Sequence, residues 1–186
     1  SASGSYTTTA APTSVTITSV VPNTLNVGAT PTSIVYTLVA SAAGALAQTS
    51  SHTVVITPAG GAGKIYTASQ TVACAMGGTT TGTCSPTCAT SDASVLTVTL
   101  AGTNCAVANS ASFTITTTDN MVANAAAGSQ AMGIVTSTDT ASVNGAYTTV
   151  DSSITITSVV PNTLTVGVTP TSIVYTLVAS DVGGIS

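Results

Sequence analysis

Apolar and polar residues alternate along much of this chain, and that alternation is typical of β-strands. In Leu96–Leu100 every second residue is apolar and the residues between are threonines. Phe113–Thr116 and Val15–Thr18 follow the same order. Successive side chains of a strand point to opposite faces of its sheet, and threonine suits a strand because it is β-branched. We therefore expect sheets with one buried apolar face and one outward face covered by threonine.

The same pattern over the whole chain predicts an all-β fold. Clusters of glycine, proline, asparagine and serine separate the apolar runs, and no helical period is present. Met121–Ala131 is the one helix-tolerant segment, but Gly128 interrupts it and we expect a loop there. Seven or eight short strands in one unit favour a β-sandwich of two sheets. The strands are expected at 14–20, 33–40, 52–57, 64–67, 70–76, 94–101, 111–118 and 131–137.

A long internal repeat predicts the domain organisation. Residues 14–40 recur as residues 153–179 with an offset of 139 residues and 24 of 27 positions identical. Farther upstream, Gly4–Thr8 matches Gly145–Thr149 more loosely, with a slip of two residues. We expect residues 1–139 to form a complete repeat, and residues 140–186 to be the first third of the next. The chain is then expected to be a segment of a longer tandem array.

The incomplete second repeat carries an expectation of its own. Residues 140–186 are expected to hold only the first two strands of a sandwich, and two strands do not bury a core. This segment should therefore pack on the preceding repeat, or be completed by strands from a neighbouring subunit through strand addition.

The repeated segment resembles a known class of extracellular module. A strand, then Pro-Asn-x-Leu-x-Val-Gly, then a second strand rich in Thr, Val and Tyr, is similar to the start of IPT/TIG and bacterial Ig-like repeats. Gly63–Tyr66 and Ser94–Leu100 resemble repetitive surface proteins of microalgae and related protists. The resemblance covers most of residues 14–137 and implies an Ig-like structural or adhesive module, with no catalytic residues to carry over.

The composition excludes several classes of protein. The chain has 40 Thr and 24 Ser but one Lys and no Arg, so it has no basic surface for nucleic acid. An apolar content of 44% with a net charge of −4 excludes a disordered chain. No apolar run approaches the roughly 18 residues that span a bilayer, so no membrane insertion is expected in this segment. Sheets usually protect their edges with charge, and edges without it favour association.

Candidate chemistry is sparse. His52 is the one histidine, and no Ser and Asp can be placed beside it to form a catalytic triad, so we expect a surface residue at a strand edge. Asp139 and Asp151 flank the junction between the repeats, where a weak ion site is the alternative to solvated turns. We expect no enzyme activity, no catalytic or metal site and no cofactor.

Four cysteines predict two disulfides. Cys74, Cys84, Cys88 and Cys105 lack the paired spacing of a zinc site, and an even count suits an oxidising compartment. Of the three pairings we favour Cys74–Cys84 with Cys88–Cys105, because Gly77–Gly82 can turn the chain back on itself. Cys74–Cys105 with Cys84–Cys88 is the alternative.

Carbohydrate is expected on oxygen and not on nitrogen. None of the eight asparagines lies in an N-x-S/T sequon. Threonine-rich segments are candidate O-glycosylation sites, namely Thr7, Thr8, Thr9, Thr79, Thr80 and Thr81.

These features together favour a structural role outside the cell. We expect a subunit of an extracellular filament or cell-surface appendage whose partners are its own neighbouring repeats and subunits, with covalent glycans as a further partner. The alternative is an adhesin stalk or a glycan-binding surface module.

Overall fold

The structure, a computed structural model, describes residues 13–59, 64–91, 94–151 and 153–179. Within these residues it contains fifteen strands, one short 3₁₀ turn (η1, Gln48–Ser50) and no α-helix. The strands are β1 Thr16–Pro22, β2 Ile34–Val39, β3 Leu46–Ala47, β4 Thr53–Ala59, β5 Thr71–Val72, β6 Cys74–Gly78, β7 Thr80–Cys84, β8 Thr87–Thr90, β9 Leu96–Thr99, β10 Gly102–Val107, β11 Ser112–Thr117, β12 Gly128–Thr136, β13 Val143–Thr149, β14 Ile154–Pro161 and β15 Ile173–Ala179. The expected all-β class is confirmed.

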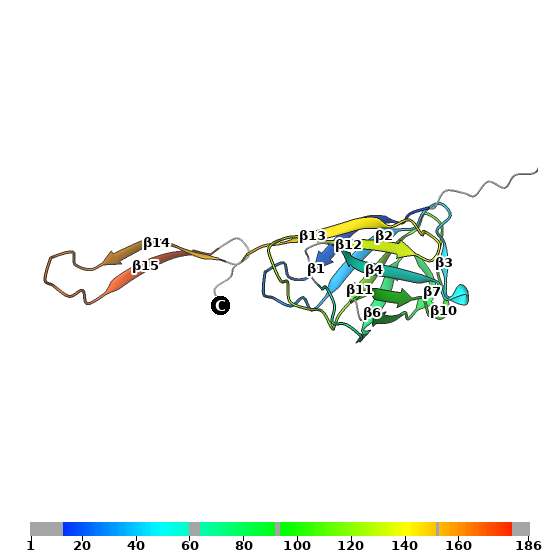
Figure 1. Ribbon diagram of the computed structural model, residues 1–186, viewed down its shortest axis with the longest axis horizontal. Coiled ribbons are helices and arrows are strands. Elements are labelled where there is room, and N and C mark those ends of the chain that lie inside the picture. Colours follow the sequence, from blue (N-terminus) through cyan, green and yellow to red (C-terminus); the bar gives the residue numbers. More distant parts are fainter. Residues whose placement is uncertain (1–12, 60–63, 92–93, 152, 180–186) are drawn as a thin grey trace, which may run out of the picture.

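The strands form four antiparallel sheets. A four-stranded sheet has the order β1-β2-β11-β6, and a six-stranded sheet has the order β13-β12-β4-β9-β8-β5. A small sheet, β3-β10-β7, lies at one end of this body, while β14 and β15 form a two-stranded sheet that projects from the opposite end (Figure 1).

Most of the predicted strands are present with shifted ends, but the strand expected at 70–76 is divided into β5 and β6, which belong to different sheets. The expected strand at 64–67 is wrong, because Tyr66 makes only a single bridge, to Met121. The loop expected at Met121–Ala131 is wrong in its last part, where Gly128 begins β12. Five strands had not been expected, and they are threonine- or glycine-rich or very short: β3, β7, β8, β10 and β13.

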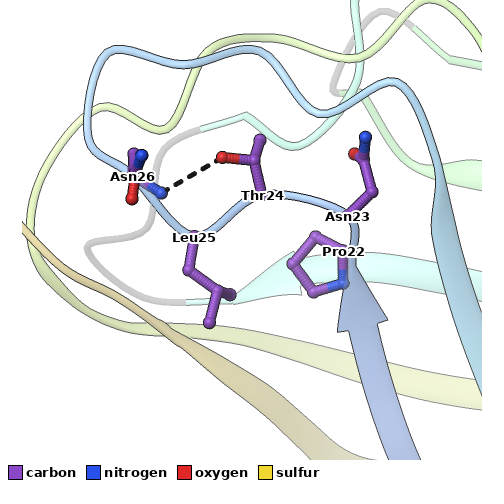
Figure 2. A pocket seen from close by; sticks show the side chains of 5 residues that line it. All are labelled: Pro22, Asn23, Thr24, Leu25 and Asn26. Carbon is purple, nitrogen blue, oxygen red and sulfur yellow. Dashed lines mark hydrogen bonds between the residues drawn. The ribbon is translucent and has the colours of Figure 1, made fainter. Parts of the chain in front are cut away.

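The loop between β1 and β2 has a local structure of its own. Pro22 ends β1, and the Asn26 amide donates a hydrogen bond to the Thr24 hydroxyl at 3.4 Å (Figure 2). The Asn23 side chain closes the loop: its carbonyl accepts from the Thr32 amide at 2.8 Å, and its amide donates to the Thr32 hydroxyl at 2.7 Å. These contacts need no residue outside the hairpin.

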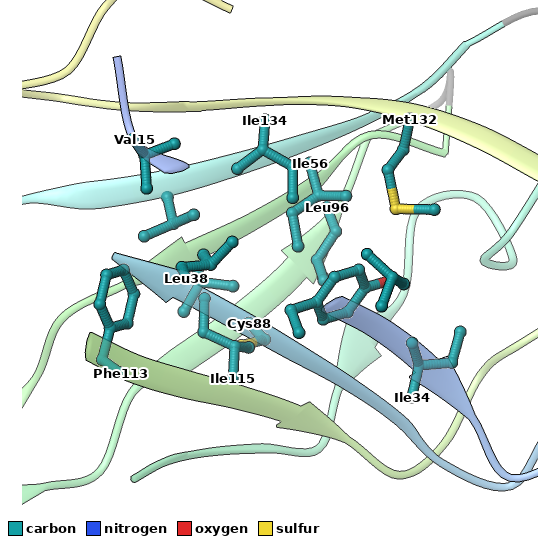
Figure 3. Packing of buried hydrophobic residues seen from close by; sticks show 14 of the residues in the cluster. Val15, Ile34, Leu38, Ile56, Cys88, Leu96, Phe113, Ile115, Met132 and Ile134 are labelled. Carbon is teal, nitrogen blue, oxygen red and sulfur yellow. The ribbon is translucent and has the colours of Figure 1, made fainter. Parts of the chain in front are cut away.

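One apolar core lies between the four-stranded and six-stranded sheets. Figure 3 shows Leu38 and Ile115 of the first sheet turned toward Ile56, Leu96 and Ile134 of the second. All five side chains are fully buried. The expected outward threonines are confirmed in β9 and β11, where buried apolar residues alternate with partly exposed threonines.

The two disulfides correct the expected pairing. The structure joins Cys74 to Cys88 and Cys84 to Cys105, which is neither pairing considered from the sequence. The favoured pairing required β6 and β7 to face each other as a hairpin. Instead β6 pairs with β11 and β7 pairs with β10, so the two strands belong to different sheets.

Each bridge therefore has a different structural role. Cys74–Cys88 connects β6 of the four-stranded sheet to β8 of the six-stranded sheet, and Cys88 is buried in the core. Cys84–Cys105 crosses between the neighbouring strands β7 and β10, where the register shifts after Thr103.

Strand β13 lies in the segment assigned from the sequence to the second repeat. It pairs along its whole length with β12, and its Tyr147 is buried in the first core. Gly145 allows β13 to approach β1 closely, since an added Cβ would lie 3.0 Å from Ile17 and 3.3 Å from Val20. The backbone of Val150 then bonds to Leu25 and Val27, so β13 runs alongside β1 in the same direction.

Candidate assembly surface

The two copies of the repeated segment fold into the same hairpin. β14 pairs with β15 in the register that joins β1 to β2, so that Val159 lies opposite Tyr175 as Val20 lies opposite Tyr36. Both hairpins shift register at the same place, between Ile17 and Ser19 and between their counterparts in β14. Among the described residues, the two segments, identical at 24 of 27 positions, therefore have the same hairpin pairing with and without a partner strand beside it.

The hydrogen bonds by which the Asn23 side chain closes its loop also recur in the second copy. The Asn162 amide donates to the Thr171 hydroxyl at 2.7 Å, and the Asn162 side-chain carbonyl accepts from the Thr171 amide at 3.1 Å. Asn23 and Thr32 make the same two contacts in the first copy.

The two hairpins differ in what covers them. Among the described residues, no strand pairs with either edge of β14–β15, whereas β2 pairs along its length with β11. The exposed fractions of the matching side chains show the consequence. Tyr36 is 0% exposed and Tyr175 is 56%; Ile34 is 0% and Ile173 is 46%; Leu38 is 0% and Leu177 is 46%; Val20 is 7% and Val159 is 52%.

These side chains define the candidate assembly surface, which we call the open hairpin face: Val159, Ile173, Tyr175 and Leu177. Neighbouring apolar side chains that are all about half-exposed are typical of an interaction site. Tyr36 lies in the core, whereas Tyr175 does not, because among the described residues the strands that bury Tyr36 have no equivalent beside β15.

Polar contacts between the first copy and the rest of the body have no counterpart among the described residues at the open hairpin face. The Tyr36 hydroxyl hydrogen-bonds with the Tyr66 hydroxyl at 2.7 Å, which hydrogen-bonds in turn with the Thr117 hydroxyl at 2.9 Å. Burial raises the pKa of Tyr36 well above its ordinary value. Burial also raises the pKa of Tyr66 to about 12, although the bonds from Thr117 and Tyr36 oppose that rise. Both phenols are therefore neutral hydrogen-bonding groups.

The two aspartates at the junction, Asp139 and Asp151, lie in different surroundings. Asp139 had been expected to be a solvated turn residue or an ion ligand, but its side chain is fully buried and accepts from the Ser41 amide at 3.0 Å and from the Ser41 hydroxyl. Burial raises the pKa of Asp139, but the hydrogen bonds from Ser41 and Thr13 outweigh it, and the net pKa is lowered. The Gly44 backbone passes so close to the carboxylate that any Cβ would overlap it. Asp151 is exposed.

The remaining candidate residues lie in separate places. His52 Nδ1 accepts a hydrogen bond from the Ala47 amide at 3.0 Å, which holds the turn around η1. In the described part of the chain, no three His, Cys, Asp or Glu side chains are grouped to hold a metal ion. Thr79 and Thr81 are exposed and Thr80 is half-buried, at the turn from β6 into β7. Thr7, Thr8 and Thr9 lie outside the described residues, and glycosylation at all six stays a prediction.

A shallow pocket opens beside the first loop. Its volume is about 350 Å³ and it is lined by five consecutive residues, Pro22–Asn26 (Figure 2). The lining has no aromatic ring on which a sugar could stack and no ionisable group. Among the described residues, the structure contains no helix that could span a lipid bilayer.

Comparisons with known proteins found no matching family model, no matching curated protein and no matching solved structure.

Proposed function

We propose that this chain is a structural subunit of an extracellular filament or cell-surface appendage, built from tandem Ig-like β-sandwich repeats. The observation that supports this most directly is the repeated hairpin. One copy is completed by the rest of the body, and the other copy has the same fold and an open apolar face. A sequence that is repeated with all but one of its core positions unchanged belongs to a second unit of the same kind.

The structure suggests a revised boundary for the proposed repeat. The four-stranded and six-stranded sheets share one core, which is the arrangement of a sandwich, and β13 is part of it. We place the end of this repeat near Asp151 instead of residue 139. Gly145–Thr149, the segment that matches Gly4–Thr8 in sequence, then lies within this repeat, in β13.

Charge and covalent chemistry support the proposed location and role. With one lysine and five aspartates in 186 residues, the sheet surfaces carry too little charge to repel one another. Two disulfides are compatible with an oxidising environment outside the cell.

Immunogold electron microscopy of the cells that produce this protein tests the proposal. Antibodies raised against residues 1–151 should label fibres or appendages outside the cell, at many positions along each one. Antibody adsorbed beforehand with the same chain is the control and should give no label. Label confined to the cell interior, or to dispersed secreted material, would contradict the proposed function.

A further inference from the structure

The first copy of the repeat shows which partner fits the open hairpin face. Residues 41–151, which we call the scaffold, hold the β1–β2 hairpin by backbone pairing on one side and by side-chain packing beneath it. On the pairing side, β11 bonds to β2 from Ser112 opposite Val39 to Thr117 opposite Ile34. The matching edge of β15 has the same residues and no partner strand among the described residues.

Side-chain contacts add specificity to this pairing. The scaffold offers the Tyr66 hydroxyl to Tyr36, and β13 packs Gly145 against Ile17 and Val20. The hairpin residues in these contacts recur unchanged as Tyr175, Ile156 and Val159. A scaffold that binds the first hairpin therefore meets the same groups in the second.

Two of the three positions that differ between the copies contact the scaffold through backbone atoms. At Asn26 and Ala29 the scaffold contacts the backbone: the Asn124 side-chain amide donates to the Asn26 carbonyl at 3.1 Å, and the Asn124 amide donates to the Ala29 carbonyl at 3.0 Å. Thr165 and Val168 have the same two backbone carbonyls, so both contacts are available in the second copy. At Val15 the second copy has Ile154, which is larger by one methylene group.

The scaffold of the same molecule cannot accept the second hairpin. To replace the first hairpin, residue 153 would have to take the place of Ser14, near Ala141, which bonds to Thr13. Val150 is bonded at the opposite end of β1, beside Leu25. The seven residues of β1 span about 23 Å, and residues 151–153 reach at most about 11 Å. The acceptor must therefore be a second copy.

From these contacts we propose that β14–β15 is a donor hairpin that completes the scaffold of a second copy of this repeat, in the site that β1–β2 occupy here. The proposal rests on the repeat architecture proposed above and names its contact. The donor adds its β15 edge to β11 of the acceptor, and the open hairpin face enters the acceptor's core. This is strand addition with a hairpin in place of a single strand.

Co-expression tests the proposal with the full chain as donor. Tagged residues 1–186 are produced under oxidising conditions together with an untagged chain of residues 41–151, which lacks its own hairpin. The scaffold should be recovered with the full chain at equal molar amounts. Tagged residues 1–151, which lack only the donor hairpin, are the control and should recover none.

Two variants of the full chain separate docking from nonspecific adhesion. Ile173→Asp places a charge on the open hairpin face and should lower recovery by roughly tenfold or more, because a buried unpaired charge is strongly unfavourable. Val174→Asp is the matched control on the opposite face, since its counterpart Val35 is only partly buried in the first copy and lies outside the core, and it should retain recovery.

Three outcomes would overturn the proposal: a scaffold recovered with neither tagged chain, equal recovery with residues 1–151, or full recovery by Ile173→Asp. Self-association of the full chain without capture of the scaffold would also overturn it, because the hairpins would then pair with each other. Labelled extracellular fibres together with failed capture would leave the proposed function standing and remove only the donor role.

Discussion

Matching residues of the two hairpins make the same local hydrogen bonds but differ in burial. Asn23 and Asn162 make the same loop contacts in both copies, because each needs only the residues of its own hairpin. Tyr36 and Tyr175 have identical neighbours in sequence, yet one is buried against Tyr66 and the other is half-exposed. Local hydrogen bonds repeat with the sequence, whereas burial requires residues that are distant in the chain.

The two tyrosines provide a matched pair of substitutions. Tyr36→Phe should lower the free energy of unfolding by about 1 kcal/mol, because the buried Tyr66 hydroxyl loses one of its two partners. Tyr175→Phe should change it by less than about 0.5 kcal/mol, since surface substitutions rarely do more. Urea denaturation followed by circular dichroism measures both. Equal effects of the two substitutions would show that Tyr36 is not held as described.

Asp139 predicts a dependence of stability on pH. Its pKa is lowered in the folded protein, so its contribution is present above its unfolded pKa of about 3.9 and is lost as the pH falls through the lower, folded pKa. Asp139→Asn should cost about 1–3 kcal/mol at pH 7, because the charged acceptor of two Ser41 hydrogen bonds is removed.

Urea denaturation of both proteins from pH 7 to pH 2 checks this prediction. The difference in stability should shrink at the acidic end, where Asp139 itself is protonated. Asp151→Asn, at an exposed position, is the control and should have little effect at any pH. A difference that stays constant down to pH 2 would mean that the Asp139 charge does not act through Ser41.

At the scale of elements, the disulfides show how sheet membership decides a pairing. Loop entropy alone does not select a disulfide pairing, because its cost changes slowly with loop length. The cysteines of the two observed bridges are 14 and 21 residues apart. The pairing follows from β6 and β7 leaving the turn at Gly78 in different directions, each to join a different sheet. Because those partners, β11 and β10, come later in the chain, the local pattern around Gly77–Gly82 does not contain this information.

Removal of either bridge should cost about 3 kcal/mol, the chain-entropy value for loops of this length. The two double variants are Cys74→Ala with Cys88→Ala, and Cys84→Ala with Cys105→Ala. Thermal unfolding measures the loss, and each double variant serves as the control for the other. A double variant with wild-type stability would contradict the structural role of that bridge.

Mass mapping after peptic digestion at acid pH checks the pairing directly, because thiol–disulfide exchange needs the thiolate. Linked peptides should contain Cys74 with Cys88 and Cys84 with Cys105. A peptide that links Cys74 to Cys84 would restore the pairing first expected from the sequence.

At the scale of the whole molecule, one body has a buried core and one hairpin, β14–β15, has none. The body buries a core between two sheets and includes β13, while β14–β15 continues beyond it (Figure 1). The hairpin pairs only within itself among the described residues, so the body does not depend on it.

Two deletions of matched sequence test this independence. A chain of residues 1–151 should melt at the temperature of the full chain and bind less of the dye ANS, because the exposed apolar side chains are removed. Deletion of residues 14–40 from the chain of residues 1–151 should prevent cooperative folding, because no hairpin is then left to pair with β11. Thermal unfolding and ANS fluorescence measure both. A lower melting temperature for residues 1–151 would mean that the hairpin packs on the body.

The sequence by itself determined the all-β class, the threonine faces of the strands and the repeated hairpin with its register. These features are local, because they follow from alternation along one strand and from turns of a few residues. Only the tertiary structure decided the disulfide partners, the burial of Asp139 beneath Ser41 and the membership of β13 in the first body. Each of these depends on which distant strands meet, and the alternation within a strand is the same whichever strand lies beside it. The repeat makes this division visible, since one 27-residue sequence forms one hairpin twice and only the surrounding chain decides whether its apolar face is buried.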